Sequence, residues 1–151
     1  MQRLPDGRKV PRVSVEAPEV SAAREPIVVV AAVIERDGRF LVTRRLKGTH
    51  LPGYWEFPGG KCEPGESHED CLRRELDEEL GVTADVLDEV VTTEHAYPDR
   101  TVRLHFRRCN LRGTPEPRLG QEMRWVTRED LRALELPEAD RALVVALTGT
   151  S

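Results

Sequence analysis

The segment from Gly59 to Val82 joins a glycine-rich turn to a helix with leucines on one face and carboxylates beside them. Leu72, Leu76 and Leu80 recur every four residues, the spacing at which side chains share one face of a helix. The stripe predicts an amphipathic helix over about residues 67–80, which must pack its leucines against another layer. A serine stands at its start and a glycine follows its end, as N-caps and C-caps require.

Carboxylates lie along the flank of this predicted helix. Glu75, Glu78 and Glu79 are three and four residues apart, so they share one side. Most glutamate runs of this kind are solvated faces with salt bridges, such as one from Arg74 to Glu78. Beside a glycine-rich turn, clustered carboxylates also suit Mg²⁺ or Mn²⁺, which take oxygen ligands and substrate phosphates. The segment therefore indicates metal-assisted attack on a phosphoanhydride.

Composition excludes several classes of protein. With 151 residues, 38% hydrophobic and 33% charged, the chain has the size of one globular domain. A net charge of −4 argues against stable binding to nucleic acid, which normally needs a basic face. No apolar run approaches the roughly 20 residues of a membrane span, and the start lacks a secretory signal. Three cysteines without metal-ligand spacing indicate reduced thiols. We expect a cytoplasmic monomer or homodimer without a membrane partner.

The chain divides into an extension and one domain. Residues 1–25 mix prolines with charges and show no lasting period, which predicts a flexible N-terminal extension. Residues 26–151 are expected to form a single α/β domain. The apolar run 27–34 predicts a strand buried on both faces, with layers above and below it. Asp37-Gly38 predicts a hairpin turn, and the strand returns at 39–44.

Shorter elements are expected in the rest of the domain. In one predicted strand Val102, Leu104 and Phe106 alternate with polar residues, the period of a half-exposed face. Thr127 is placed to cap a short helix. The sequence predicts strands at 55–57, 88–95, 101–110 and 124–126, a turn at 97–100, and helices at 127–134 and 138–147.

The segment after Gly59 resembles the Nudix box, G-x5-E-x7-R-E-U-x-E-E-x-G-U, in which U is a bulky aliphatic residue. Every fixed position is filled, by Gly60, Glu66, Arg74, Glu75, Leu76, Glu78, Glu79, Gly81 and Val82. The resemblance implies an α/β/α sandwich with a mixed β-sheet, in which the box forms a loop–helix–loop. It also implies hydrolysis of nucleoside diphosphates linked to another group, with Mg²⁺ or alternatively Mn²⁺ as the cofactor.

Outside the box the chain looks most similar to the MutT-type branch of the family. The similarity lies in WEFPGGK at 55–61, YPDR at 97–100 and the spacing to Trp125. It implies hydrolysis of a nucleoside triphosphate, such as 8-oxo-dGTP or a cytidine triphosphate, to monophosphate and pyrophosphate, in nucleotide pool sanitation and DNA repair. The alternatives are another nucleoside diphosphate derivative, such as ADP-ribose or a dinucleoside polyphosphate, and a non-catalytic nucleotide-sensing module.

The resemblance also implies roles for the box residues. The implied metal ligands are the Gly60 carbonyl, Glu75, Glu78 and Glu79. Arg74 is expected to orient Glu75 and Glu78, and Glu66 to hold the loop against the helix. Plain salt bridges are the alternative for both, and the two roles are compatible. Glu122, shortly before Trp125, lies where the family often places a further acid, used as base or metal ligand; the alternative is a surface charge.

Candidate substrate-binding residues lie outside the helix. Arg45 resembles an arginine that reaches the substrate, while Lys61 and Arg100 either meet the nucleotide or remain solvated. Tyr97 is an aromatic candidate for stacking on the base. Asp140 falls where MutT carries an asparagine that reads the base. An ionised carboxylate only accepts hydrogen bonds, so it would suit a base edge that presents donors. The alternative is an acid at a helix N-terminus.

Overall fold

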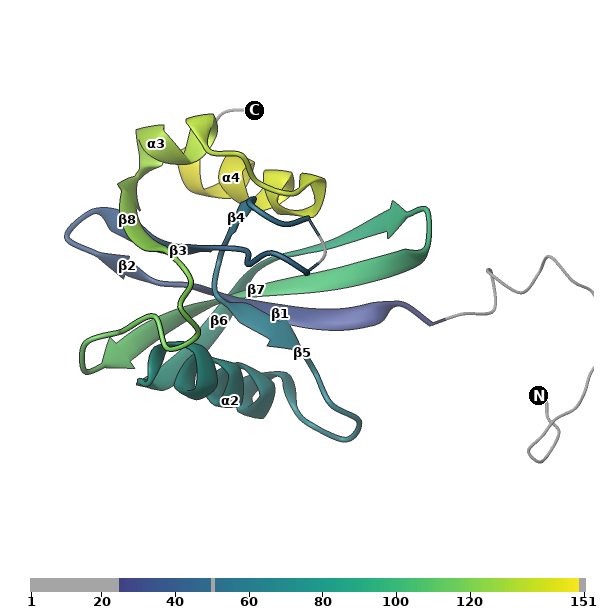
Figure 1. The fold of residues 1–151 in the computed structure, drawn as a ribbon, viewed down its shortest axis with the longest axis horizontal. Helices are drawn as coiled ribbons and strands as arrows, with labels where there is room; N and C mark the ends of the chain where they lie inside the picture. The colour runs from purple at the N-terminus through teal and green to yellow at the C-terminus, as the bar shows by residue number, and fades with distance from the viewer. Residues whose placement is uncertain (1–24, 50, 150–151) are drawn as a thin grey trace, which may run out of the picture.

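The strands of the protein are covered by helices on both sides. The computed structural model describes residues 25–49 and 51–149, so the expected extension lies outside the described residues apart from Glu25. Helix α2 (His68–Leu80) covers one side, and α3 (Arg128–Ala133) with α4 (Arg141–Thr148) covers the other (Figure 1). This arrangement confirms the expected α/β/α sandwich. Within the described part of the chain, no helix combines the length and apolar character needed to cross a bilayer.

The first sheet is mixed. Its order is β5 (Gly59–Lys61), β1 (Ile27–Val33), β7 (Arg100–Arg112) and β6 (Thr83–Tyr97). Strand β1 runs parallel to β7 and antiparallel to β5, and β6 is antiparallel to β7. The pairing places Gly59 and Gly60 on the edge of this sheet, next to β1.

The second sheet is built around a hairpin. It contains β2 (Glu35–Arg36), β3 (Arg39–Arg44) and β4 (Trp55–Glu56), and β8 (Met123–Thr127) pairs with β3. The turn between β2 and β3 has positive φ at both central residues, 53° at Asp37 and 76° at Gly38. Those angles are typical of a type I′ hairpin turn, so the hairpin predicted at Asp37-Gly38 is confirmed.

The β6–β7 hairpin is longer than the sequence predicted. A connection of only Pro98 and Asp99 joins two long strands, where strands at 88–95 and 101–110 were expected. The pairing register of β6 shifts between Val86 and Glu89 and again between Glu89 and Val91. Such irregularities break the two-residue alternation of a strand. The shifts therefore interrupt the alternation of β6 after Val86.

The core consists of two hydrophobic clusters on opposite faces of β1. Val30, Ala32 and Ile34 pack with the leucines of α2, while Ala31 and Val33 belong to the cluster under α3 and α4. This confirms that β1 is buried on both faces. The cysteines Cys62, Cys71 and Cys109 are free thiols, and Cys71 lies fully inside the α2 cluster.

The helix ends follow local capping rules. The Ser67 hydroxyl accepts a hydrogen bond from the Asp70 backbone N–H at 3.0 Å, and Gly81 ends α2 with φ of 67°. Both caps were predicted. Thr127 caps α3 through a capping box with Asp130. The helix expected over 138–147 is divided into a 3₁₀ turn, η1 (Glu138–Asp140), followed by α4.

Candidate active site

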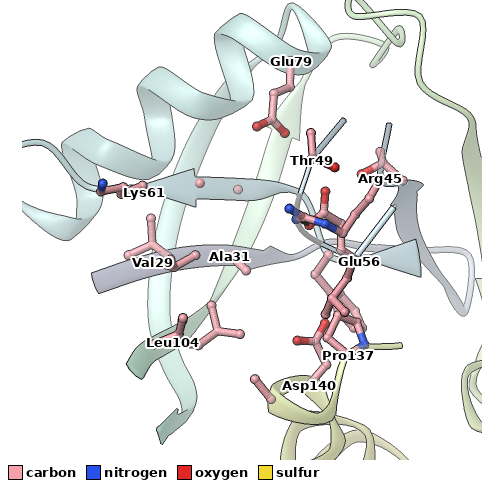
Figure 2. A pocket seen from close by; sticks show the side chains of 18 of the residues that line it. Val29, Ala31, Arg45, Thr49, Glu56, Lys61, Glu79, Leu104, Pro137 and Asp140 are labelled. Atoms are coloured by element: carbon pink, nitrogen blue, oxygen red, sulfur yellow. Dashed lines mark hydrogen bonds and ion pairs between the residues drawn. The ribbon is translucent and has the colours of Figure 1, made fainter. Parts of the chain in front are cut away.

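One pocket of about 400 Å³ collects most of the predicted site residues. Its walls come from α2, η1, the strands β1, β3, β4, β5, β6 and β7, the loop after β3, and the segment before β8. Figure 2 shows Glu79 of α2 at one end, Arg45 and Glu56 along one wall, and Asp140 at the other end. One ligand in the pocket could therefore contact Glu79 at one end and Asp140 at the other.

At the α2 end, a glycine makes room for a carboxylate. Gly60 in β5 lies directly against Glu75 of α2. A Cβ atom on Gly60 would lie 2.3 Å from Glu75 Cδ and 2.5 Å from each of its carboxylate oxygens. Any side chain at residue 60 would displace this carboxylate. The glycine of the box is thus explained by close approach of an acid to the backbone.

Glu79 lies beside Glu75 at the same end. Burial, a hydrogen bond that the protonated Glu79 donates to Glu75, and the charges of Glu75 and Glu56 together raise the pKa of Glu79 to about 9. Without a cation Glu79 is therefore mostly a neutral acid at pH 7. Two carboxyl groups held together this closely suit a hard divalent cation, which would replace the proton.

The protein supplies only part of a coordination sphere. Within residues 25–49 and 51–149, no three side chains of histidine, cysteine, aspartate or glutamate converge on one metal position. Mg²⁺ commonly takes one or two carboxylates and completes its octahedron with waters and substrate phosphates. Glu75, Glu79 and the Gly60 backbone fit that mode of binding.

Arg74 ties the loop of the box to the helix. Its Nε and Nη2 atoms donate to the two carboxylate oxygens of Glu66 at 2.8 and 2.9 Å. Its Nη1 atom donates to Glu75 at 3.1 Å, and Nη2 donates to the Lys61 carbonyl at 3.2 Å. The hydrogen bond from Arg74 is the main cause that lowers the pKa of Glu66 to about 2. Arg74 and Glu66 thus contact the groups that they were expected to orient, and neither lines the pocket.

Besides Glu66 and Glu75, two predicted acids do not line the pocket. The Glu78 side chain is 57% exposed and has a long contact of 3.5 Å with Arg74. The Glu122 side chain is also 57% exposed, and its carboxylate accepts from Arg44 at 2.7 Å. Glu78 lies near Glu75, since both contact Nη1 of Arg74, whereas Glu122 contacts Arg44 and is not brought to Glu75 and Glu79. Where the segment before β8 passes the pocket, it contributes Leu119 and Gln121 instead.

The predicted substrate-binding residues are brought together from distant parts of the chain. They come from the end of β3, the end of β5, both sides of the β6–β7 turn, and η1. The residues are Arg45, Lys61, Tyr97, Arg100 and Asp140, and all of them line the pocket. Cationic side chains therefore lie in the same cavity as Glu79 of α2.

Asp140 differs from the expectation of an ionised carboxylate. It is 4% exposed, and burial raises its pKa to about 8, with the charge of Glu56 adding and Arg45 opposing. The expected form was wrong, because the sequence does not show how deeply η1 is covered. A neutral carboxyl both donates and accepts hydrogen bonds, as the amide of asparagine does.

Sequence reasoning missed Glu56, which forms part of the pocket wall. Its carboxylate accepts from Arg45 Nη1 at 2.6 Å, and burial raises its pKa although Arg45 opposes the shift. The neighbours Trp55 and Phe57 are buried in the core cluster under α3 and α4. In a strand, side chains alternate between faces, so two apolar neighbours were a signal that Glu56 faces the pocket.

Relatives with known names match most of the chain. A family model described as "NUDIX domain" matches residues 29–146. The CTP pyrophosphohydrolase of Escherichia coli (strain K12) is 39% identical over 121 residues, covering 80% of this chain and 90% of that protein. The 8-oxo-dGTP diphosphatase of the same strain is 31% identical over 121 residues, covering 80% and 94%.

Solved structures agree with this assignment. The solution structure of the E. coli ORF135 protein has a TM-score of 0.76 at 36% identity and covers 85% of this chain and 92% of that one. The MutT NUDIX hydrolase from Burkholderia pseudomallei has a TM-score of 0.75 at 27% identity, covering 83% and 100%. The chain therefore belongs to the Nudix hydrolases, the family of the NUDIX domain.

Proposed function

We propose that the protein is a divalent-metal-dependent nucleoside triphosphate pyrophosphohydrolase. It would convert a triphosphate to the monophosphate and pyrophosphate. The observation that carries the proposal is the pocket with Glu79 at one end, where Glu75 and Gly60 adjoin it, and the buried Asp140 at the other. Relatives that act on CTP and 8-oxo-dGTP, according to their names, support the choice of a triphosphate.

Mg²⁺ is the proposed cofactor, with Mn²⁺ as the alternative. Glu75, Glu79 and the Gly60 carbonyl would hold it, and Glu78 would act through a water molecule because its side chain is exposed. The bound ion would neutralise phosphate charge and supply an activated water. Since Glu122 does not line the pocket and its carboxylate is paired with Arg44, we assign it no part in this step.

The remaining residues would hold and orient the reacting groups. Arg74 donates to both Glu66 and Glu75, so it fixes Glu75 relative to the glycine loop. Lys61, Arg45 and Arg100 line the pocket as cations for the triphosphate. The apolar lining from β1 and β7 would exclude water around the sugar and base. It consists of Ile27, Val29, Ala31, Val102, Leu104 and Phe106.

Asp140 and Tyr97 are the proposed base contacts. The neutral Asp140 carboxyl offers a donor and an acceptor at neutral pH. Cytosine presents an amine beside a ring nitrogen acceptor, and oxidised guanine presents a ring N–H beside a carbonyl. Both bases would satisfy such a group, so a cytidine triphosphate and an oxidised guanine nucleotide are the proposed substrates.

Sanitation of damaged nucleotides, with a benefit to DNA repair, would follow from action on 8-oxo-dGTP, the substrate in the name of the E. coli relative. A cytoplasmic location for a monomer or homodimer belongs to the same proposal. The three free cysteines and the net charge of −4 support a reduced compartment without nucleic acid as a stable partner.

A panel of nucleotides tests the proposal. Purified protein with Mg²⁺ is incubated with 8-oxo-dGTP, dCTP, CTP, 5-substituted cytidine triphosphates, ADP-ribose and diadenosine polyphosphates, and the products are separated by ion exchange. Monophosphate and pyrophosphate from a triphosphate are expected, and Glu79→Gln should lose activity while remaining folded. Cleavage of only the linked dinucleotides would overturn the triphosphate assignment. Undiminished hydrolysis by Glu79→Gln would overturn the metal site.

A further inference from the structure

The segment between β7 and β8 docks on the C-terminal end of α2. The Glu116 backbone N–H donates to the Leu80 carbonyl at 3.0 Å, and the Arg118 backbone N–H donates to the Glu79 carbonyl at 3.0 Å. The last carbonyls of a helix have no partners within the helix. Residues 113–122 supply partners for them, so this segment determines how the last turn of α2 is held.

Gln121 adds a side chain to this contact. Its Nε2 atom donates to the Glu79 carbonyl at 3.2 Å, and its Oε1 atom accepts from the Leu119 backbone N–H at 2.8 Å. The residue is only 7% exposed. Of the common side chains of this length, only an uncharged amide both donates and accepts in this way. Gln121 therefore connects the segment to the backbone of a proposed metal ligand.

Residues of this contact also form one wall of the pocket. Glu79, Leu119 and Gln121 all line it. Leu119 has an exposed hydrophobic side chain. Its backbone N–H donates to Gln121, and this hydrogen bond holds Leu119 at the pocket. A shift of this wall would move Glu79 and Leu119 together.

We infer that Gln121 is a positioning residue, which aligns Glu79 for divalent metal binding by fixing its backbone against the segment before β8. The inference rests on the proposed function. A glutamate side chain is flexible, so the position of its carboxylate depends on how firmly its backbone is held. Groups that orient metal ligands without touching the metal strongly affect metal affinity and activity. Gln121 is uncharged, so it does this without adding to the acidic charge of the site.

Two neutral substitutions test the inference. Gln121→Met and Gln121→Leu keep the size of the side chain and remove its hydrogen bonds. Thr127→Ala is the matched control, because it removes the N-cap of α3 and lowers stability without contacting Glu79. Mn²⁺ affinity without nucleotide is measured by electron paramagnetic resonance, and kcat and KM are measured with the nucleotide that the wild type cleaves.

A weakening of Mn²⁺ binding by about 10-fold or more is expected in both Gln121 variants, with a similar fall in kcat and little change in KM. Thr127→Ala should keep wild-type values at a lower melting temperature. Gln121 variants that behave like Thr127→Ala would overturn the inference, since only a structural role would remain. A rise in KM with unchanged Mn²⁺ affinity would also overturn it, because Gln121 would then act on the substrate directly.

A measurement on the wild type covers the case in which the variants do not fold. The side-chain N–H resonances of Gln121 should shift with Mg²⁺ over the same concentration range as the Glu79 carboxyl resonance. Resonances of Gln121 that do not respond while Glu79 is saturated would overturn the inference. If the wild type neither binds Mn²⁺ nor cleaves any nucleotide, the proposed function itself fails, and the inference fails with it.

Discussion

The buried Asp140 carboxyl interacts electrostatically with two residues of opposite charge, Glu56 and Arg45. Because burial raises its pKa to about 8, the protonated form dominates at pH 7 and both donates and accepts. Asp140→Asn should therefore bind the nucleotide as well as the wild type at pH 7. As the pH rises through 8, KM should increase for the wild type and not for the variant.

The ratio of the two KM values between pH 6.5 and 9.5 is the measurement. Titration of the nucleotide and of the metal ligands affects both proteins equally, so the ratio isolates Asp140. A ratio that stays constant over this range would contradict a role for its proton in base binding. Asp140→Ala offers neither donor nor acceptor, so its free energy of nucleotide binding should be weaker by about 1–3 kcal/mol at every pH.

Glu56 controls the same proton from the pocket wall. Its charge raises the pKa of Asp140, and its carboxylate holds Arg45 at 2.6 Å. Glu56→Gln removes this charge and releases Arg45, so the pKa of Asp140 should fall below that of the wild type. An NMR titration of the Asp140 carboxyl carbon gives the value directly.

A carboxylate outside the pocket provides the control for Glu56. Glu94 pairs with Arg103 across the β6–β7 hairpin at 3.5 Å, and neither residue lines the pocket. Glu94→Gln removes one charge from the protein without changing the surroundings of Asp140. If Glu94→Gln lowered the pKa of Asp140 as much as Glu56→Gln, net charge and not the Arg45 pair would be responsible.

Among the elements, α2 depends on a glycine at its end. Gly81 has φ of 67°, and a Cβ atom there would lie 2.3 Å from Arg118 Nε. Gly81→Ala should therefore cost the left-handed strain of about 1–2 kcal/mol and also displace Arg118. Urea denaturation measures the loss of unfolding free energy.

Gly149 offers a matched substitution. It ends α4 with φ of 75°, and a Cβ atom there would have nothing within 4 Å. Gly149→Ala should cost only the backbone strain, so Gly81→Ala should be the more destabilising of the two. Equal losses would mean that contact between Arg118 and the end of α2 does not stabilise the fold.

The same elements show what the sequence can predict. Both ends of α2 were predicted, because Ser67 and Gly81 act on the backbone next to them. The start of β6, residues 83–87, was not predicted, and the register shifts between Val86 and Val91 separate it from the part of the strand that was. The strand β5 was read as a glycine turn, since its pairing with β1 is a tertiary contact.

The site divides in the same way. The proximity of Gly60, Glu75 and Glu79 could be predicted because the three residues lie in one continuous motif. Glu56 and Gln121 carry no motif of their own. Their contacts, with Arg45 and with the Glu79 carbonyl, join segments 11 and 42 residues apart in the sequence. Such contacts arise only when the sheets and α2 have packed.

In the whole molecule, the carboxyl groups of Glu75 and Glu79 lie beside the apolar core and form no part of it. Glu75 and Glu79 belong to neither of the two hydrophobic clusters around β1. Chelation of divalent metals should therefore abolish hydrolysis and leave the protein folded. Circular dichroism before and after addition of EDTA, with activity measured in parallel, tests this separation.

Mg²⁺ should then stabilise the folded molecule in a pH-dependent way. The pKa of Glu79 rises from 4.5 to about 9 on folding, so its neutral form stabilises the metal-free protein below pH 4.5. That contribution is lost progressively as the pH rises towards 9. A cation at Glu79 must displace the proton, so it binds more weakly in acid.

The increase in melting temperature on adding Mg²⁺ should consequently be larger at pH 8 than at pH 5.5. At a concentration of 100 times Kd the stabilisation would reach about 2.7 kcal/mol. The melting temperature of Glu79→Gln should rise only slightly with Mg²⁺ at both pH values, because an amide carries no charge and does not titrate. An equal response of wild type and variant would place the Mg²⁺ elsewhere on the protein. A wild-type response that did not change with pH would mean that the Glu79 proton does not compete with the metal.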